Sequence, residues 1–171
     1  MNIIETKHTN ANNITFEYEF TSKSESISNK QRADVPSILA VEALFIIKIN
    51  DERYFEAELA ILEFYKALFE WKTKVRDNFV PEFHYYTIEY GEYEDGALIS
   101  LWPFSHQAKV TSIWAEADLH NVFERDYVVA AFCALEQRLR EDIEGYFHID
   151  LKYFLQHIPE HIPYFDDEEA T

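Results

Sequence analysis

The fold is decided by the stretch from Pro81 to Ala117, which has the sequence PEFHYYTIEYGEYEDGALISLWPFSHQAKVTSIWAEA. Three segments of this stretch are rich in aromatic and β-branched residues, and turn-forming residues separate them at Glu94-Asp95-Gly96 and at Ser105–Gln107. This pattern predicts a three-stranded antiparallel meander. Its expected strands are Phe83–Tyr93, Ala97–Phe104 and Lys109–Ala115.

The charge of this stretch is unusual. From Asp77 to Ala108 there is no Lys or Arg, whereas six acidic residues are interleaved with eight aromatic ones. Tyrosine and tryptophan dominate the contact energy of protein interfaces, and clustered carboxylates steer a basic partner toward them. The sequence therefore predicts a partner-binding surface at one strand end and its turn. Its candidate residues are Glu89, Tyr90, Glu92, Tyr93, Glu94 and Asp95.

The composition and net charge of the chain exclude several classes of function. A chain of 171 residues with 47% hydrophobic content fits one domain over residues 1–171. A formal net charge of −17 repels nucleic-acid phosphates and anionic lipid, so we expect a basic protein partner and neither nucleic-acid nor membrane binding. The single cysteine, Cys133, excludes a disulfide framework within the chain, and no apolar run is long enough to span a bilayer. We therefore expect a cytoplasmic protein.

The rest of the chain alternates between strand and helix patterns. Strict alternation over Ile14–Phe20 predicts a half-buried strand, and the apolar run Glu42–Ile49 predicts a central one. Tyr54–Glu56 is expected to pair back briefly. An apolar stripe that includes Trp71 predicts a helix from about Glu58 to Lys74 with Trp71 in the core, and a second stripe predicts one from about Glu124 to Gly145.

Three further segments complete the prediction. Gly145 is expected to cap the second helix in a left-handed conformation, and Asp150 to cap a short helix over Leu151–Ile158. Thr21–Asp34 is polar and is expected to be a mobile surface loop, and residues 164–171 a disordered acidic tail. The fold class is therefore α+β: an antiparallel sheet of about five to six strands, with two long helices and a short C-terminal helix packed on it.

No sequence motif indicates a particular enzymatic reaction. Three scattered glycines exclude phosphate-binding loops, and there is no paired-cysteine zinc spacing. Two clusters could hold a metal: His157 and His161 with His148 upstream, and Asp118 and His120 with Glu124. Pro159 disrupts the helix that would place His157 and His161 on one face, and zinc would need further ligands there. The second cluster is explained more simply as acidic residues at the positive end of a helix dipole, so we expect no cofactor and no metal. Cys133 is best explained by packing.

The layout resembles that of small cytoplasmic bacterial immunity proteins, which protect a cell against a polymorphic toxin. The resemblance covers roughly Ile14 to Ile158 and rests on the strand and turn before Tyr54-Phe55-Glu56, the aromatic hairpin closed by Glu94-Asp95-Gly96, and Phe147-His148-Ile149-Asp150-Leu151. It is equally similar to an uncharacterised bacterial family of the same fold. The first resemblance implies a non-enzymatic inhibitor that binds a basic, nuclease-type toxin domain. The alternatives are a metal-assisted hydrolase that uses Asp118, His120 and Glu124, and a self-associating scaffold.

Overall fold

The structure is a computed structural model that describes residues 12–88, 96–117 and 120–160. It is an α+β fold with two antiparallel sheets. The first sheet has the order β1-β2-β3 and the second has the order β4-β5-β6-β7. The strands are β1 Ile14–Phe20, β2 Glu42–Ile49, β3 Glu52–Ala60, β4 Phe83–Tyr85, β5 Ile99–Phe104, β6 Gln107–Thr111 and β7 Val122–Glu124. The helices are α2 Val35–Leu39, α3 Ile61–Lys74 and α4 Arg125–Phe147, with 3-10 turns η1 Ser24–Ser26, η2 Asn29–Gln31 and η3 Leu151–Tyr153.

The α+β class with antiparallel pairing is confirmed, but the expected single sheet of five to six strands is wrong. Strand β3 passes directly into α3 between Ala60 and Ile61, so the chain leaves the first sheet along that helix. It then returns as β4, which pairs with β5 and not with β3. Within the described ranges of the chain, one backbone hydrogen bond, from Glu116 N to Tyr54 O at 2.8 Å, joins the residues after α3 to β3.

The first sheet follows its sequence pattern closely. In β1 the buried or half-buried side chains alternate with exposed ones, and β2 is the central strand, as predicted. Strand β3 is much longer than expected and pairs with β2 from Glu52 to Ala60. The predicted helix start at Glu58 was therefore three residues early, because Leu59 and Ala60 are buried as strand residues. The predicted helix end at Lys74 is confirmed.

The second sheet contains the predicted meander with shorter strands and one additional strand. The described part of the first strand is only Phe83–Tyr85, and the turn after β5 is confirmed because Phe104 pairs with Gln107. The additional strand, β7, consists of Val122–Glu124 and pairs with β6, and the sequence did not predict it. The signal was missed because a strand of three residues is too short to show alternation.

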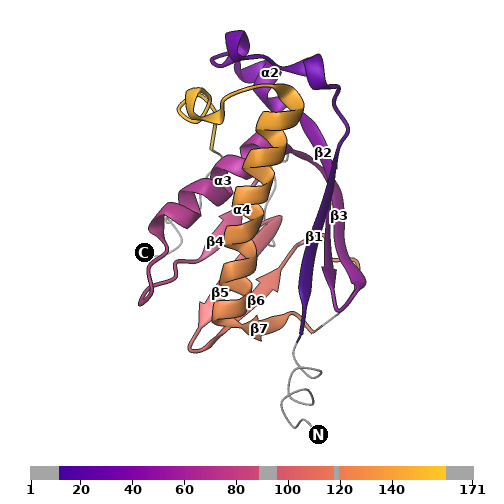
Figure 1. The fold of residues 1–171 in the computed structure, drawn as a ribbon. Coiled ribbons are helices and arrows are strands. Elements are labelled where there is room, and N and C mark those ends of the chain that lie inside the picture. Colours follow the sequence, from indigo (N-terminus) through magenta and orange to yellow (C-terminus); the bar gives the residue numbers. More distant parts are fainter. Residues whose placement is uncertain (1–11, 89–95, 118–119, 161–171) are drawn as a thin grey trace, which may run out of the picture.

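Helix α4 lies between the two sheets and contacts both of them. Figure 1 shows it running along the molecule, with the three-stranded sheet on one side and α3 on the other, and its N-terminal half crossing the four-stranded sheet. Phe132 of α4 packs edge-on against Phe16 of β1, Trp71 of α3 and Phe83 of β4. This aromatic cluster joins both sheets and both long helices in one core, and Trp71 lies in that core as predicted.

The polar segment Thr21–Asp34, which was expected to be a mobile surface loop, is mostly exposed but contains short ordered turns. It contains η1 and η2, and Ile27 is only 1% exposed in the core. Two hydrogen bonds tie it to the end of α4: Tyr146 Oη donates to Ser22 O, and Asp150 N donates to Asn29 Oδ1. A single buried isoleucine therefore anchors a segment that is otherwise polar.

The C-terminal predictions need two corrections. Gly145 lies inside α4, and the left-handed cap residue is His148 with φ 56°. After Asp150 only the 3-10 turn η3 forms in place of a helix to Ile158, and no side-chain hydrogen bond from Asp150 caps it. The Asp150 carboxylate instead pairs with Lys152 at 3.3 Å. The predicted acidic tail, residues 164–171, lies outside the described residues.

Candidate functional site

The second sheet buries one face and exposes the other. Phe83, Tyr85 and Leu101 point into the core, so by strand alternation the residues between them point outward. On this outward side Trp102 is 41% exposed and Phe104 is 44% exposed. We call this surface the open sheet face. Its residues on β4, β5 and β6 are His84, Ser100, Trp102, Phe104, Lys109 and Thr111.

Side-chain contacts hold the open sheet face in one conformation. His84 Nδ1 lies 2.7 Å from Ser100 Oγ, and its Nε2 lies 3.0 Å from Glu82 Oε1. The Trp102 ring packs edge-on against the His84 ring, with centroids 4.5 Å apart, and Trp102 Nε1 donates to Thr111 Oγ1 at 3.0 Å. The Trp102 ring is therefore positioned by His84 of β4 and Thr111 of β6, which lowers the entropy that this side chain loses when a partner binds.

Ser100, His84 and Glu82 are hydrogen-bonded in series and have the residue types of a hydrolase triad. The serine, however, is not accessible to a substrate. Ser100 is only 2% exposed, so its hydroxyl does not meet a substrate from solution. A triad also needs donors that stabilise an oxyanion at the nucleophile. We interpret these three side chains as a structural hydrogen-bond network that fixes the Trp102 ring.

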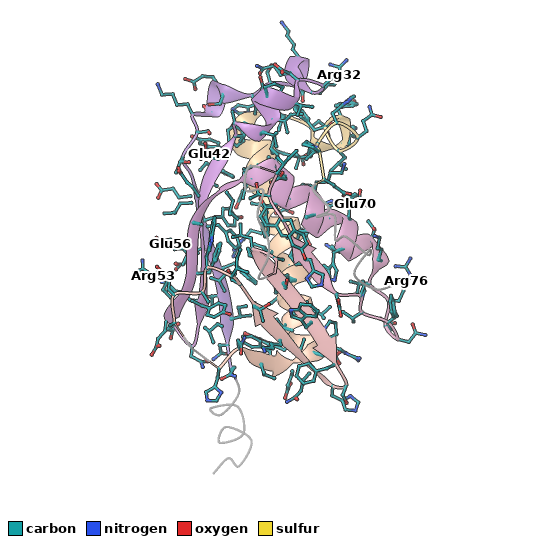
Figure 2. The ribbon with its side chains drawn as sticks, turned by 180° about the vertical axis from the view of Figure 1, so that it is seen from behind. Arg32, Glu42, Arg53, Glu56, Glu70 and Arg76 are labelled. Carbon is teal, nitrogen blue, oxygen red and sulfur yellow. The ribbon has the colours of Figure 1, made fainter. Side chains whose placement is uncertain are left out.

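A groove lies between α3 and the edge strand β4. Its volume is about 220 Å³, which is smaller than the roughly 300 Å³ at which small-molecule pockets begin. We call it the α3–β4 groove. It is lined by Glu63, Ala67, Glu70, Trp71 and Lys74 of α3, by residues 81–86, and by Pro159 and Glu160. Figure 2 shows Glu70 on α3, on the side of the molecule opposite Arg53 and Glu56 of β3.

A buried carboxylate organises one end of this groove. Glu63 is 3% exposed, and its two oxygens accept hydrogen bonds from Tyr85 Oη at 2.9 Å and from Ile88 N at 3.0 Å. Trp71 Nε1 donates to Pro81 O at 2.9 Å at the other end. Two side chains of α3 therefore fix the chain on both sides of β4. Burial also raises the pKa of the Tyr86 phenol, which lines the groove and stays neutral.

A second buried carboxylate belongs to the helix pair. Glu136 of α4 accepts from Lys72 Nζ at 3.2 Å, and Arg140 Nε lies 3.7 Å from it. Tyr65 Oη donates to it at 3.4 Å, and burial followed by the Glu136 charge raises the pKa of this phenol. These contacts join α3 to α4, and because both lysine and arginine compensate the charge we assign Glu136 a structural role.

The predicted contact residues Glu89, Tyr90, Glu92, Tyr93, Glu94 and Asp95 lie outside the described residues. After β4 the described chain continues to Ile88, whose N–H donates to Glu63, and it resumes at Gly96, whose φ of 121° favours glycine. Segment 89–95 contains all six of these predicted residues. Whether it contacts a partner stays a prediction.

The structure does not assemble the proposed metal sites among the residues that it describes. The described residues contain no group of three or more His, Cys, Asp or Glu side chains that could hold a metal ion. His120 and Glu124 are described and exposed, whereas Asp118 is not among the described residues. Of the histidines, His148 caps α4, His157 lies in the turns after η3, and His161 lies outside the described part.

Cys133 packs against the core at the side of α4, in keeping with its predicted role. Burial raises the pKa of its thiol, so it does not have the lowered pKa of a reactive nucleophile.

The open sheet face and the α3–β4 groove were not predicted from the sequence. The alternation of Phe83, His84 and Tyr85 was available as a signal for two faces of one strand. Glu63 gave no signal, because a glutamate in an amphipathic helix is ordinarily exposed, and only the packing of the second sheet shows that it is buried.

The comparison with protein families gives one match. The chain belongs to the family described as Domain of unknown function (DUF7878), whose model matches residues 16–145. No curated protein and no solved structure matches the chain. None of the helices in the described parts of the chain has the length and apolarity needed to cross a bilayer.

Proposed function

We propose that this protein is a non-enzymatic, acidic binding module that occupies a basic protein, as an immunity protein occupies a nuclease-type toxin domain. The observation that carries the proposal is the open sheet face, where Trp102 and Phe104 are exposed and the Trp102 ring is held by His84 and Thr111. Rigid aromatic side chains with exposed area are the usual anchors of protein interfaces. The net charge of −17 supports a basic partner, because it attracts such a partner over long range.

The proposed interface extends from the open sheet face into segment 89–95. The aromatic side chains supply the contacts that are desolvated on binding, and the carboxylates Glu92, Glu94 and Asp95 supply speed and specificity of association. Replacing these three acids by Lys is expected to slow association by at least about tenfold while the protein still folds. An unchanged association rate would remove this segment from the interface.

The direct test is capture of partners from lysate of the native cell at about 0.05 M and about 1 M salt, since screening over this range removes long-range attraction. We expect one basic protein to be retained at low salt and released at high salt. The purified partner must then form a stoichiometric complex and lose its activity in that complex. Retention that is independent of salt, or a partner that keeps full activity, contradicts the proposal.

A matched pair of variants locates the interface. Replacing both Trp102 and Phe104 by Ser is expected to weaken the captured complex by about 2 kcal/mol or more, as loss of central aromatic contacts does. Tyr153→Ser is the control, since Tyr153 is also an exposed aromatic but lies in η3, away from the second sheet. Equal weakening by both variants would exclude the open sheet face. Stoichiometric metal that is lost on His120→Ala would instead favour the hydrolase.

A further inference from the structure

The α3–β4 groove has a net negative charge, because its carboxylates outnumber its basic side chains. Four carboxylates line it, from Glu63, Glu70, Glu82 and Glu160, against one lysine, Lys74. Among the described residues, no ion pair joins Lys74 to any of these carboxylates. The groove therefore has a local excess of negative charge within an already acidic protein.

The four carboxylates are not equivalent. Both oxygens of Glu63 already accept hydrogen bonds, from Tyr85 and from the backbone of Ile88, and Glu82 lies 3.0 Å from His84. The Glu70 carboxylate makes neither a hydrogen bond nor an ion pair with any described residue; only its backbone carbonyl accepts one, from Thr73. It is half-buried on the groove wall, so its charge is only partly solvated and is available to a cation.

The walls of the groove also suit a cation with an apolar stem. Trp71, Phe83, Tyr85 and Tyr86 line the groove next to the carboxylates; Tyr86 is half-buried, whereas the other three are at most 4% exposed. Lysine and arginine bury their methylene groups along apolar surface and place their charged ends on carboxylates, and aromatic faces attract them. A volume of about 220 Å³ is many times the roughly 10–15 Å³ that one water needs, and is therefore enough for a side chain.

We infer that the α3–β4 groove is a recognition pocket for a lysine or arginine side chain presented by the basic partner. The charged end lies at Glu70 and Glu82, and the stem lies along Trp71 and Tyr86. This inference rests on the proposed function, because that function supplies the basic partner, but it concerns a different surface from segment 89–95. Glu82 and His84 border both the groove and the open sheet face, so one partner can occupy both.

The pocket can be tested without the natural partner. The probe is the peptide Ac-Ser-Lys-Thr-Arg-Ser-NH2, titrated into isotope-labelled protein and followed by nuclear magnetic resonance. The matched probe Ac-Ser-Gln-Thr-Gln-Ser-NH2 has the same length without the charges. We expect the charged peptide alone to produce saturable shifts of the Trp71 indole N–H, which lies on the groove wall, while the indole signal of Trp114 stays unchanged.

Substitutions then test whether the Glu70 and Glu82 carboxylates bind the charged peptide. Glu70→Gln and Glu82→Gln together are expected to weaken binding of the charged peptide by at least about fivefold, because each removes an unscreened attraction at close range. The control is Glu56→Gln, which removes one negative charge from a half-buried position on the opposite side of the molecule and leaves Arg53 paired with Glu116. The control is expected to change affinity by less than about twofold.

The outcomes separate the pocket from the proposed function. Weak shifts spread over the acidic surface without saturation, or equal weakening by Glu56→Gln and by the double variant, would overturn the pocket. If a basic partner is captured and inhibited but its affinity ignores the double variant, the proposed function stands and the pocket fails. If the peptide binds at Trp71 while no captured protein is salt-sensitive and inhibited, the pocket stands and the proposed function fails.

Discussion

Tyr85→Phe is the most informative single substitution, because it deletes one oxygen atom at a defined buried contact. Tyr85 is 1% exposed and its hydroxyl donates to the carboxylate of Glu63, which is itself 3% exposed. A hydrogen bond to a charged group contributes about 1.5–3 kcal/mol. The ring of the new phenylalanine keeps its edge-on contact with Phe64, so packing changes little. We therefore expect the free energy of unfolding to fall by about 2 kcal/mol.

The assay is equilibrium unfolding in urea, followed by tryptophan fluorescence. With a slope of about 2 kcal/mol/M, which is typical of a chain of this size, the midpoint is expected to fall by about 1 M. Tyr153→Phe provides the control, because its hydroxyl is on an exposed side chain and its removal is expected to change the midpoint by less than about 0.25 M. An unchanged midpoint for Tyr85→Phe would refute the reasoning that Glu63 fixes the chain between Tyr85 and Ile88.

Three further predictions concern α4 and its neighbours. Lys72→Met is expected to lower the free energy of unfolding by about 2 kcal/mol, measured by urea unfolding, because it leaves the buried Glu136 carboxylate with less compensation; an increase in stability would contradict this. Burial and a hydrogen bond to Asp142 raise the pKa of Tyr18 from 10.0 to about 12, so the stability that this phenol contributes is complete below pH 10 and is lost as the pH rises through about 12. The alkaline loss, measured as the urea midpoint against pH, should be smaller in Tyr18→Phe, and identical profiles would exclude the assignment. Cys133 is expected to react with iodoacetamide at pH 8 several-fold more slowly than free cysteine, because burial raises the pKa of its thiol, and an equal rate would show that the site is accessible.

The first sheet was predictable because its chemistry is local. Alternation of Ile14, Phe16 and Tyr18 depends only on the two-residue period of a strand with one buried face. The predicted end of α3 at Lys74 is confirmed for a similar reason, since the apolar stripe of that helix stops there. The boundary between β3 and α3 was missed because Leu59 and Ala60 suit either element, and only pairing with β2 selects the strand.

The candidate site was much less predictable. The sequence indicated a binding surface from the aromatic and acidic composition between Asp77 and Ala108, but the residues it selected lie outside the described part of the chain. The groove needs α3 to lie beside β4, and these elements are separated in the sequence by a segment without regular periodicity. No local pattern in the sequence indicates that these two elements pack against each other.

The sequence by itself determined the α+β class, the antiparallel pairing, the two long helices and the acidic character, because periodicity and charge are properties of neighbouring residues. The tertiary structure alone decided that the strands divide into two sheets, that Ile27 and Glu63 are buried, and that β4 forms a groove with α3. These features depend on contacts between residues far apart in the chain. Phe132 illustrates the reason: its apolar side chain predicts burial, but only the packed core decides that it meets Phe16, Trp71 and Phe83.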